Sequence, residues 1–474
     1  MTVDRQSQSH SHTQRWVSIS SAAIPALALL LAAVPARAQE ERLSAPSLPD
    51  SASDEAPPTQ DRVQTLEERI TELGDRIREA EEARQKAVSP LSWNGYVDFG
   101  YFVPLGNRGV GWIRDAGNVQ FPQYAGYSWT FLGDILGTAI NTRGEVADLG
   151  DAPDAPRFDS VNSDGASSFI LNEVNIRPRF QLSERAIMRA SVNFIPRTGS
   201  DFALGDFVDI DTGELEYLLT TDGKTSLFVG KMMPVIGIEY KDRKSDQRFG
   251  ITPSLISRYT VGSQLGIKIR SKLLDDWLIL AAAVTNNSST IEMFHFYSEI
   301  DHNHGKTLNG RGAVSIPVGR LYRSDDRLEI GVSGEWGPQD RATNNAGKMW
   351  FAGLDLQYLG VNFALKGQLL EGKSPGNADM GVWGLDLKPS GYLELDWQLL
   401  ARFGLIIRGE FRDAVVTLGS ERIYITKEAR FTGGFRVVIN PHTIVKAEYL
   451  HNEEYGGIAE FDNDIATSSL VLAF

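Results

Sequence analysis

Cysteine is absent from this chain of 474 residues, and basic residues are in deficit. Without cysteine no wrong disulfide can form in an oxidising compartment, which suits an exported protein. Lys and Arg number 47 against 61 Asp and Glu, so the formal net charge is −14. Because nucleic-acid binding requires a basic surface that displaces counterions from phosphates, we expect no nucleic-acid partner.

Long apolar runs are missing after residue 38. The earlier run, residues 16–34, follows Arg15 and precedes the small-residue triplet Ala36-Arg37-Ala38. This pattern predicts a signal peptide of residues 1–38, cleaved after Ala38. A membrane anchor is the alternative, but Pro25 and the serines within the run favour cleavage. No later stretch reaches the roughly 18 apolar residues of a membrane helix, so any crossing must use strands.

Catalytic and cofactor motifs are also absent. The sequence contains no G-x-S-x-G and no H-E-x-x-H, so we expect neither an enzyme nor a bound cofactor. The stretch GQLLEGKS, residues 367–374, matches the phosphate-binding P-loop expression, but a Pro-Gly-Asn turn follows where a helix would have to begin. The three histidines within residues 295–304 are interpreted as loop residues, so we expect no metal site.

The segment before the strands divides into a linker and a helix. Residues 39–60 are rich in Pro, Ser, Ala and Asp, a composition that predicts a flexible linker. Apolar residues then recur at alternating spacings of three and four: Val63, Leu66, Ile70, Leu73, Ile77 and Ala80. This heptad pattern predicts a short periplasmic coiled coil over residues 61–88, as a dimer or a trimer, with a solvated single helix as the alternative.

From Trp93 onward the apolar period changes to two. Clusters of Gly, Asn, Asp and Pro separate the runs, a pattern typical of half-buried antiparallel strands. The clearest runs are 93–103, 261–269, 328–336, 350–358, 361–369, 403–411, 431–439 and 470–474. About ten residues a strand predicts sixteen strands over residues 90–474, with eighteen as the alternative. The long strandless stretches near 104–128 and 140–167 are then extracellular loops, or a loop folded into the interior.

Aromatic and charged positions decide between a sandwich and a barrel. Three pairs of aromatic residues lie eight residues apart, each pair on one apolar face: Trp93 and Tyr101, Trp350 and Tyr358, and Phe403 and Phe411. At about 3.3 Å per residue and a tilt near 40°, this spacing climbs roughly 20 Å, close to an apolar membrane band with its aromatic girdles.

The opposite face carries many charges, which a dry sandwich core cannot hold without a large desolvation cost. We therefore predict a transmembrane antiparallel β-barrel with a water-filled lumen. The candidate pore-lining residues are Asp98, Lys268, Arg270, Asp355, Lys366, Arg402, Arg408, Glu410 and Arg436.

The last strand ends on Phe474, with Leu470 and Leu472 on the same face. A closed barrel requires this strand to pair with the first, so we expect Phe474 to lie within the wall. The terminal Phe also resembles the insertion signal of bacterial outer-membrane proteins, which implies the barrel-assembly machinery as a partner and outer-membrane lipid as the surroundings.

Within residues 227–269, seven positions form a recognisable pattern: Gly230, Lys231, Pro234, Gly237, Glu239, Arg258 and Gly262. This pattern resembles that of the phosphate-selective porin O and P family. The resemblance implies an inward loop between two strands. Cations exceed carboxylates in that loop, as an anion filter requires. They make up the candidate constriction set of Lys241, Arg243, Lys244, Arg248 and Arg258, with a solvated turn as the alternative.

A coiled coil ahead of a barrel is similar to trimeric sugar-specific and organic-acid porins, which implies a homotrimer. The sequence thus predicts a porin in the outer membrane of a Gram-negative bacterium, a channel for passive diffusion of small hydrophilic solutes that include anions. A structural or adhesive barrel tethered through its coiled coil is the first alternative. A barrel enzyme is the second.

Overall fold

The computed structural model describes residues 90–105, 168–194, 208–286, 288–289, 304–319, 326–338, 348–377, 379, 384–419, 421–455 and 464–474. The predicted signal peptide (1–38), linker (39–60) and coiled coil (61–88) lie outside these residues. So do the loops expected near 104–128 and 140–167, apart from residues 104 and 105. The described part belongs to a compact unit, Ala87–Phe474.

Strands make up most of the described residues, because apolar and polar residues alternate along them. In chain order they are β1 (Leu91–Pro104), β2 (Ser168–Ser183), β3 (Ala186–Phe194), β4 (Val208–Leu218), β5 (Thr225–Met232), β6 (Gln264–Leu273), β7 (Leu278–Thr285), β8 (Thr307–Ile316), β9 (Arg327–Pro338), β10 (Lys348–Leu359), β11 (Phe363–Ser374), β12 (Gly384–Leu400), β13 (Phe403–Leu418), β14 (Glu421–Asn440), β15 (Thr443–Glu454) and β16 (Ile465–Ala473). Two short 3-10 helices, η5 (Glu239–Asp242) and η6 (Ser257–Tyr259), lie between β5 and β6.

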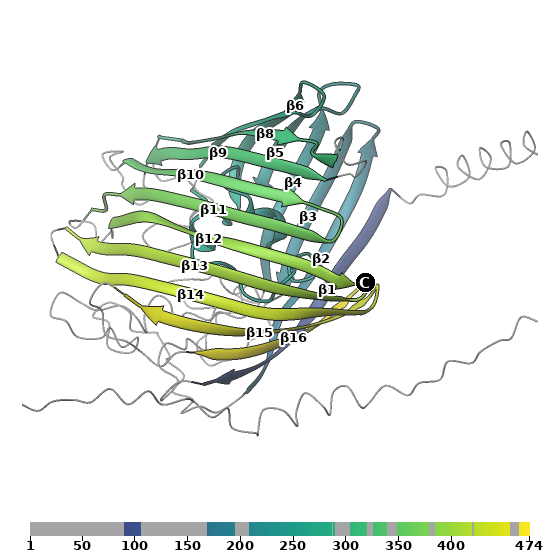
Figure 1. Cartoon of the computed structure of the whole chain (residues 1–474). Helices are drawn as coiled ribbons and strands as arrows, with labels where there is room; N and C mark the ends of the chain where they lie inside the picture. The colour runs from purple at the N-terminus through teal and green to yellow at the C-terminus, as the bar shows by residue number, and fades with distance from the viewer. Residues whose placement is uncertain are drawn as a thin grey trace, which may run out of the picture. The chain divides into compact units, whose positions relative to one another are not determined.

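The strands form one closed antiparallel barrel in which each strand pairs with its neighbours in the chain and β1 pairs with β16 (Figure 1). The predicted transmembrane barrel of sixteen strands is confirmed. Gly95 and Phe474 exchange two backbone hydrogen bonds, of 3.1 and 3.0 Å, so the last residue lies in the wall as expected. Closure leaves no sheet edge with unpaired N–H and C=O groups facing lipid.

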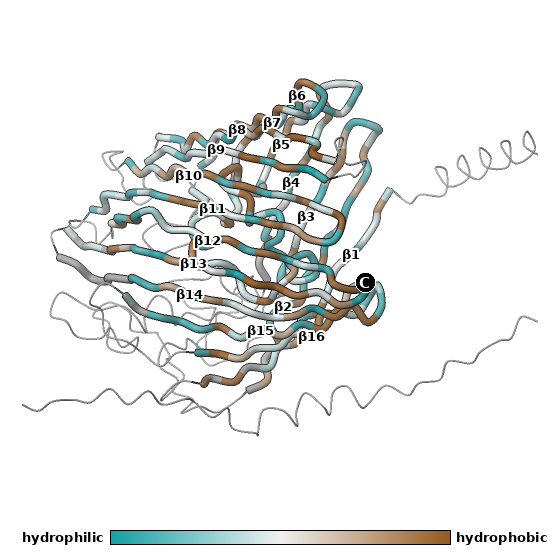
Figure 2. The backbone as a smooth tube through the Cα atoms, in the orientation of Figure 1, coloured by the Kyte–Doolittle hydropathy of each residue, from teal (hydrophilic) through white to brown (hydrophobic). Residues whose placement is uncertain are grey.

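The two faces of the wall differ in chemistry. On β10 and β13, Leu354 and Ile407 are 55% and 47% exposed, whereas their neighbours Asp355 and Arg408 are 3% and 1% exposed. Brown and teal segments follow one another along the strands in Figure 2, as this alternation requires. The predicted assignment of apolar residues to the outside and charged residues to the inside therefore agrees with the structure.

Aromatic side chains gather on the outer face. Trp93, Trp350 and Phe411 are exposed there. Rings on neighbouring strands also meet, as between Tyr358 and Phe363, whose centroids are 5.0 Å apart. Aromatic rings are favoured where a barrel passes from lipid into the headgroup layers.

The two ends of the barrel are unequal. One end carries the chain start at β1, the chain end at β16 and short turns such as residues 401–402 and 441–442. The other end carries the longer connections, among them 195–207, 233–263 and 286–306. We call the first the short-turn end.

Some predicted strand limits are wrong. The run 261–269 was expected to be strand throughout, but β6 begins at Gln264, and Val261 is buried inside the barrel. The run 361–369 begins in a turn, and β11 starts at Phe363. Residues 367–374, which match the P-loop expression, are strand residues of β11, as expected. Among the described residues, no helix is long and apolar enough to cross a membrane.

We predict that single cysteines will report the two faces cleanly, because the chain has none of its own. Leu354→Cys faces lipid and should react only with a membrane-soluble maleimide. Lys272→Cys, an exposed residue on the inner face of β6, should react with a charged, water-soluble maleimide. The measurement is the labelling rate of the folded protein in lipid vesicles. Ala282→Cys, exposed on the outer face of β7, is a second lipid-facing control. Faster aqueous labelling at position 354 than at 272 would contradict the assignment of faces.

Candidate functional site

The connection between β5 and β6, residues 233–263, enters the barrel and is here called the inward segment. Gly237 lies near its start with a φ of +70°, in the left-handed region that glycine tolerates best. A Cβ at this position would lie 2.5 Å from the side-chain amide of Gln368 on β11, so the segment passes very close to the wall. Gly237 is also one of the positions that carry the family resemblance.

The segment binds the wall formed by β1–β4 through its own side chains. Arg243 forms an ion pair with Asp211 on β4, and Lys244 lies 3.0 Å from the same carboxylate. Lys244 also lies 3.1 Å from Glu173 on β2. These groups are almost completely buried. Buried charges of this kind are tolerated only when they are paired and hydrogen-bonded, and these are.

On the other side of β1, the segment binds the wall formed by β13–β15 mainly through its backbone. Lys446 on β15 donates to the carbonyl oxygens of Ser245, Arg248 and Gly250, at 2.6, 2.6 and 2.8 Å. An ammonium has three donors, and all three are used. On the same strand, Glu448 accepts from the N–H groups of Ile251, at 2.5 Å, and Thr252, at 3.0 Å.

Arg408 on β13 lies at the centre of this second contact. Its guanidinium donates to the carbonyl of Thr252 at 2.9 Å and to Glu394 and Glu410 on the wall at 3.1 and 3.0 Å. Glu410 in turn accepts from the N–H of Leu255 at 2.6 Å. The segment is thus fixed to strands on both sides of the lumen.

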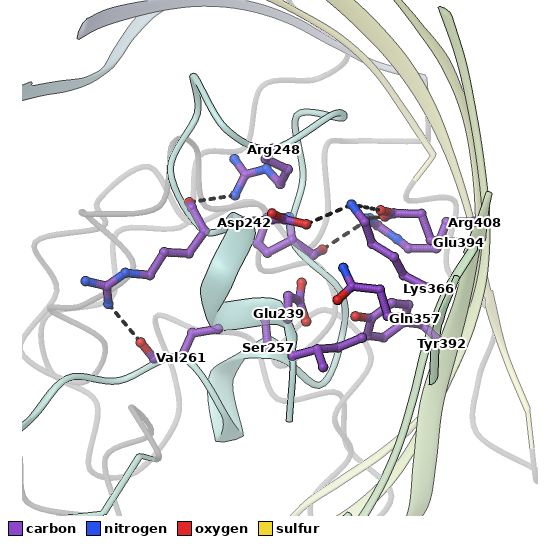
Figure 3. Close-up of a pocket in the computed structure, with 13 residues that line it drawn as sticks. Glu239, Asp242, Arg248, Ser257, Val261, Gln357, Lys366, Tyr392, Glu394 and Arg408 are labelled. Carbon is purple, nitrogen blue, oxygen red and sulfur yellow. Dashed lines mark hydrogen bonds and ion pairs between the residues drawn. The ribbon is translucent and has the colours of Figure 1, made fainter. Parts of the chain in front are cut away.

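Lys366 on β11 joins the wall to η5. Its ammonium lies 2.7 Å from Asp242 of the segment and 2.9 and 3.5 Å from Asp396 and Glu394 on β12. Figure 3 shows Lys366 between Asp242 and Glu394, with Arg408 beside them. Three carboxylates surround one ammonium, so none of these charges faces the remaining space without a partner.

Two cavities beside the segment differ in size. Toward β11–β13, a cavity of about 20 Å³ remains, lined by Glu239, Tyr392 and Arg408 among others (Figure 3). That is room for about a single water. Toward β6–β10, a cavity of about 260 Å³ remains, more than ten times as large. We call it the vestibule. It lies near the short-turn end.

The structure places eight of the nine candidate pore-lining residues on the inner face. They are Asp98, Lys268, Arg270, Asp355, Lys366, Arg408, Glu410 and Arg436. Arg402 lies in the exposed turn between β12 and β13. The predicted water-filled lumen would compensate these charges with water, but Asp98, Asp355, Arg408 and Glu410 are at most 5% exposed. Hydrogen bonds and ion pairs compensate them instead. Arg270 differs, with a side chain that is 48% exposed.

The candidate constriction residues all lie in the inward segment, but most of them face protein. Arg243, Lys244, Arg248 and Arg258 are between 2% and 5% exposed. Lys241 remains exposed and reaches Glu329 on β9 at 3.3 Å. Among the five constriction candidates, Lys241 is the one that lines the vestibule in the described structure.

Sequence reasoning missed the residues of β15 and β2 that hold the segment. Lys446, Glu448 and Glu173 were not among the candidates, although all three lie on inward-facing positions of their strands. Alternation along residues 443–454 would have placed Lys446 and Glu448 on the inside. Alternation says nothing about which groups of a distant loop they bind.

Glu239 of η5 is held by the segment itself. Its carboxylate accepts from the N–H of Ser254 at 2.7 Å and from the Ser254 hydroxyl at 2.5 Å. Burial raises the pKa of the Glu239 carboxyl above its ordinary value, although these hydrogen bonds and the positive charge of Arg408 act in the other direction. Within the described residues, no group of three or more His, Asp or Glu side chains is arranged to hold a metal ion.

No protein-family model matches the chain, and no curated protein does. Solved structures do resemble it. The outer membrane channel DcaP of Acinetobacter baumannii is 8% identical, over 81% of this chain and 97% of that one, with a TM-score of 0.48. Salmonella typhi OmpF in complex with daunomycin is 11% identical, over 81% and 97%, with a TM-score of 0.47. A mutant Rh. blastica porin is 10% identical, over 81% and 100%, with a TM-score of 0.40. Identities this low transfer no permeant and no function.

We predict that Lys446→Met will loosen the inward segment. The change leaves three buried carbonyl oxygens without their donor, at a cost of about 3 kcal/mol or more. Chymotrypsin should then cleave the segment at Tyr240 or Phe249 faster in the folded, detergent-solubilised protein. The matched control is Lys388→Met on β12, whose side chain is 54% exposed and, among the described residues, pairs only with Asp386 at 3.3 Å. Such a surface pair contributes little. Equal cleavage rates in the two variants would show that Lys446 does not hold the segment.

We predict a pH-dependent difference between the natural chain and Glu239→Gln. Because burial raises the pKa of Glu239, the ionised carboxyl costs stability above that pKa, and the cost disappears as the pH falls and the group is protonated. The natural chain should therefore gain thermal stability relative to the Gln variant as the pH falls from about 8 to about 4. The measurement is the unfolding midpoint of both proteins at each pH. A relative loss on acidification would mean that the pKa is lowered instead.

Proposed function

We propose that this protein is a channel of the bacterial outer membrane through which small hydrophilic solutes diffuse passively. The observation that carries the proposal is the inside of the barrel: it is lined by polar and charged residues, is crossed by the inward segment, and holds a vestibule of about 260 Å³. Any closed sheet in lipid turns polar residues inward, but a structural barrel has no need of free space among them. A channel needs that space, because polar solutes cross only where water and polar groups replace their hydration.

Charge in the vestibule supports a preference for anions. Arg270, Lys272 and Arg327 line it and are exposed to its water. Facing charges in a cleft with low-dielectric walls concentrate ions of opposite sign. The resemblance of residues 227–269 to phosphate-selective porins points in the same direction.

Export and assembly involve residues outside the described structure, and they involve partner proteins. Export with cleavage after Ala38 would deliver the chain to the periplasm, and the barrel-assembly machinery would insert it through β16 and Phe474. The coiled coil at 61–88 would join three copies into a homotrimer.

A structural barrel that tethers the outer membrane through its coiled coil is the second candidate. One observation favours it: the inward segment is bound to both walls, by Lys244 on one side and by contacts to Lys446 on the other. A segment fixed in this way reduces the free cross-section of the lumen.

We predict stepwise conductance when the purified, folded protein is added to a planar lipid bilayer. Ala281 and Ala282 are neighbours on β7, the first lining the vestibule and the second facing lipid. Ala281→Trp should reduce the conductance step by half or more, because the ring fills the vestibule, whereas Ala282→Trp should leave it nearly unchanged. A silent bilayer with correctly folded protein would support the tether. Equal steps in the two variants would show that ions do not pass through the vestibule.

A further inference from the structure

The vestibule combines a cationic side with an apolar side. Its cations are Lys241 of the inward segment and Arg270, Lys272, Arg311 and Arg327 of the wall. Its apolar surface comes from Val235, the ring of Tyr240, Ile279, Ala281 and Leu359. A space lined in part by apolar groups and in part by a few convergent charges is the usual form of a small-molecule site.

Three carboxylates offset part of the positive charge. Arg311 lies 2.6 Å from Glu329 and 2.5 Å from Asp355, so its charge is already used. Lys241 shares Glu329 at 3.3 Å. Arg270 has a long contact of 3.6 Å to Glu216. Five cations against these three carboxylates leave an excess of two positive charges.

The excess is carried by Lys272 and Arg327. Within the described part of the chain, neither side chain has a carboxylate within ion-pair distance. Arg327 is positioned by a hydrogen bond of 3.3 Å from its guanidinium to the hydroxyl of Ser315. Arg270 stands over the ring of Phe228, with 5.2 Å between the guanidinium carbon and the ring centroid. These contacts fix two guanidinium groups that can each take a carboxylate through paired hydrogen bonds.

We propose that the vestibule binds a small organic anion in which one carboxylate is attached to a compact apolar body. The carboxylate would lie among Arg270, Lys272 and Arg327, and the apolar body would lie against Ile279 and Leu359. The volume of about 260 Å³ restricts the ligand to a size below that of most drug-like molecules. The site would hold such an anion at the short-turn end of the barrel. Its role in transport rests on the proposed function as a channel.

Calorimetric titration of the full chain in detergent with benzoate tests this proposal, since benzoate has both the charge and the apolar body. Inorganic phosphate supplies charge without the body, and benzyl alcohol supplies the body without charge. We expect benzoate to bind at least tenfold more tightly than either. Its affinity should also fall as sodium chloride rises from about 50 mM to about 500 mM, since salt screens exposed charges. Phosphate or benzyl alcohol binding as tightly as benzoate would overturn the proposal.

Charge-reversal variants locate the site. The double variant Lys272→Glu with Arg327→Glu should weaken benzoate binding at least tenfold. The matched control is Arg402→Glu, which makes the same kind of charge change in an exposed turn at the same end of the barrel but outside the vestibule. If the double variant does not fold, Lys272→Gln alone should still weaken binding measurably. Unchanged affinity in these variants, or an equal loss in Arg402→Glu, would overturn the site.

Binding in detergent does not require conduction, so the two proposals fail separately. Benzoate binding by a protein that is silent in bilayers would support the site and contradict the channel. Conductance without benzoate binding would support the channel and overturn the site.

Discussion

The structure depends on how the charges inside the barrel are compensated. A closed sheet in lipid must turn its polar residues inward, and a charged group there is stable only beside water, an opposite charge or a set of hydrogen bonds. Arg408 and Lys446 find such partners in the inward segment rather than in water. The same contacts therefore satisfy the wall and fix the segment, and removing either partner leaves the other as a buried, unsatisfied group.

This compensation divides the lumen. Where wall and segment charges pair, as around Lys366, the space closes to about the size of a water. Along β6–β10, the cations of the wall outnumber the carboxylates that lie near them. There the space stays open and positively charged. The shape of this free space and its charge thus follow from one feature, the uneven distribution of carboxylates around the barrel.

Alternation along the strands was enough to predict the barrel, its sixteen strands, and the faces on which Leu354 and Asp355 lie. It could not separate Arg408, which is buried in ion pairs, from Lys272, which faces open space, because both occupy inward positions. That distinction depends on where a loop distant in sequence comes to rest. The wrong strand prediction for Val261 has the same origin. Apolar residues near Val261 pack within the inward segment rather than in a strand, and β6 begins only at Gln264.

The two attachments of the inward segment differ in how they would respond to sequence change. One wall recognises the side chains of Arg243 and Lys244, so substitutions there alter the fit. The other recognises mainly carbonyl and N–H groups over residues 245–255, and every amino acid except proline supplies both groups. The side chain that adds to these contacts is that of Thr252, whose hydroxyl bonds Glu448 and Arg408. Most side chains of residues 245–255 can therefore change while the segment stays in place along that wall, which would let the surface of the lumen vary on an unchanged barrel.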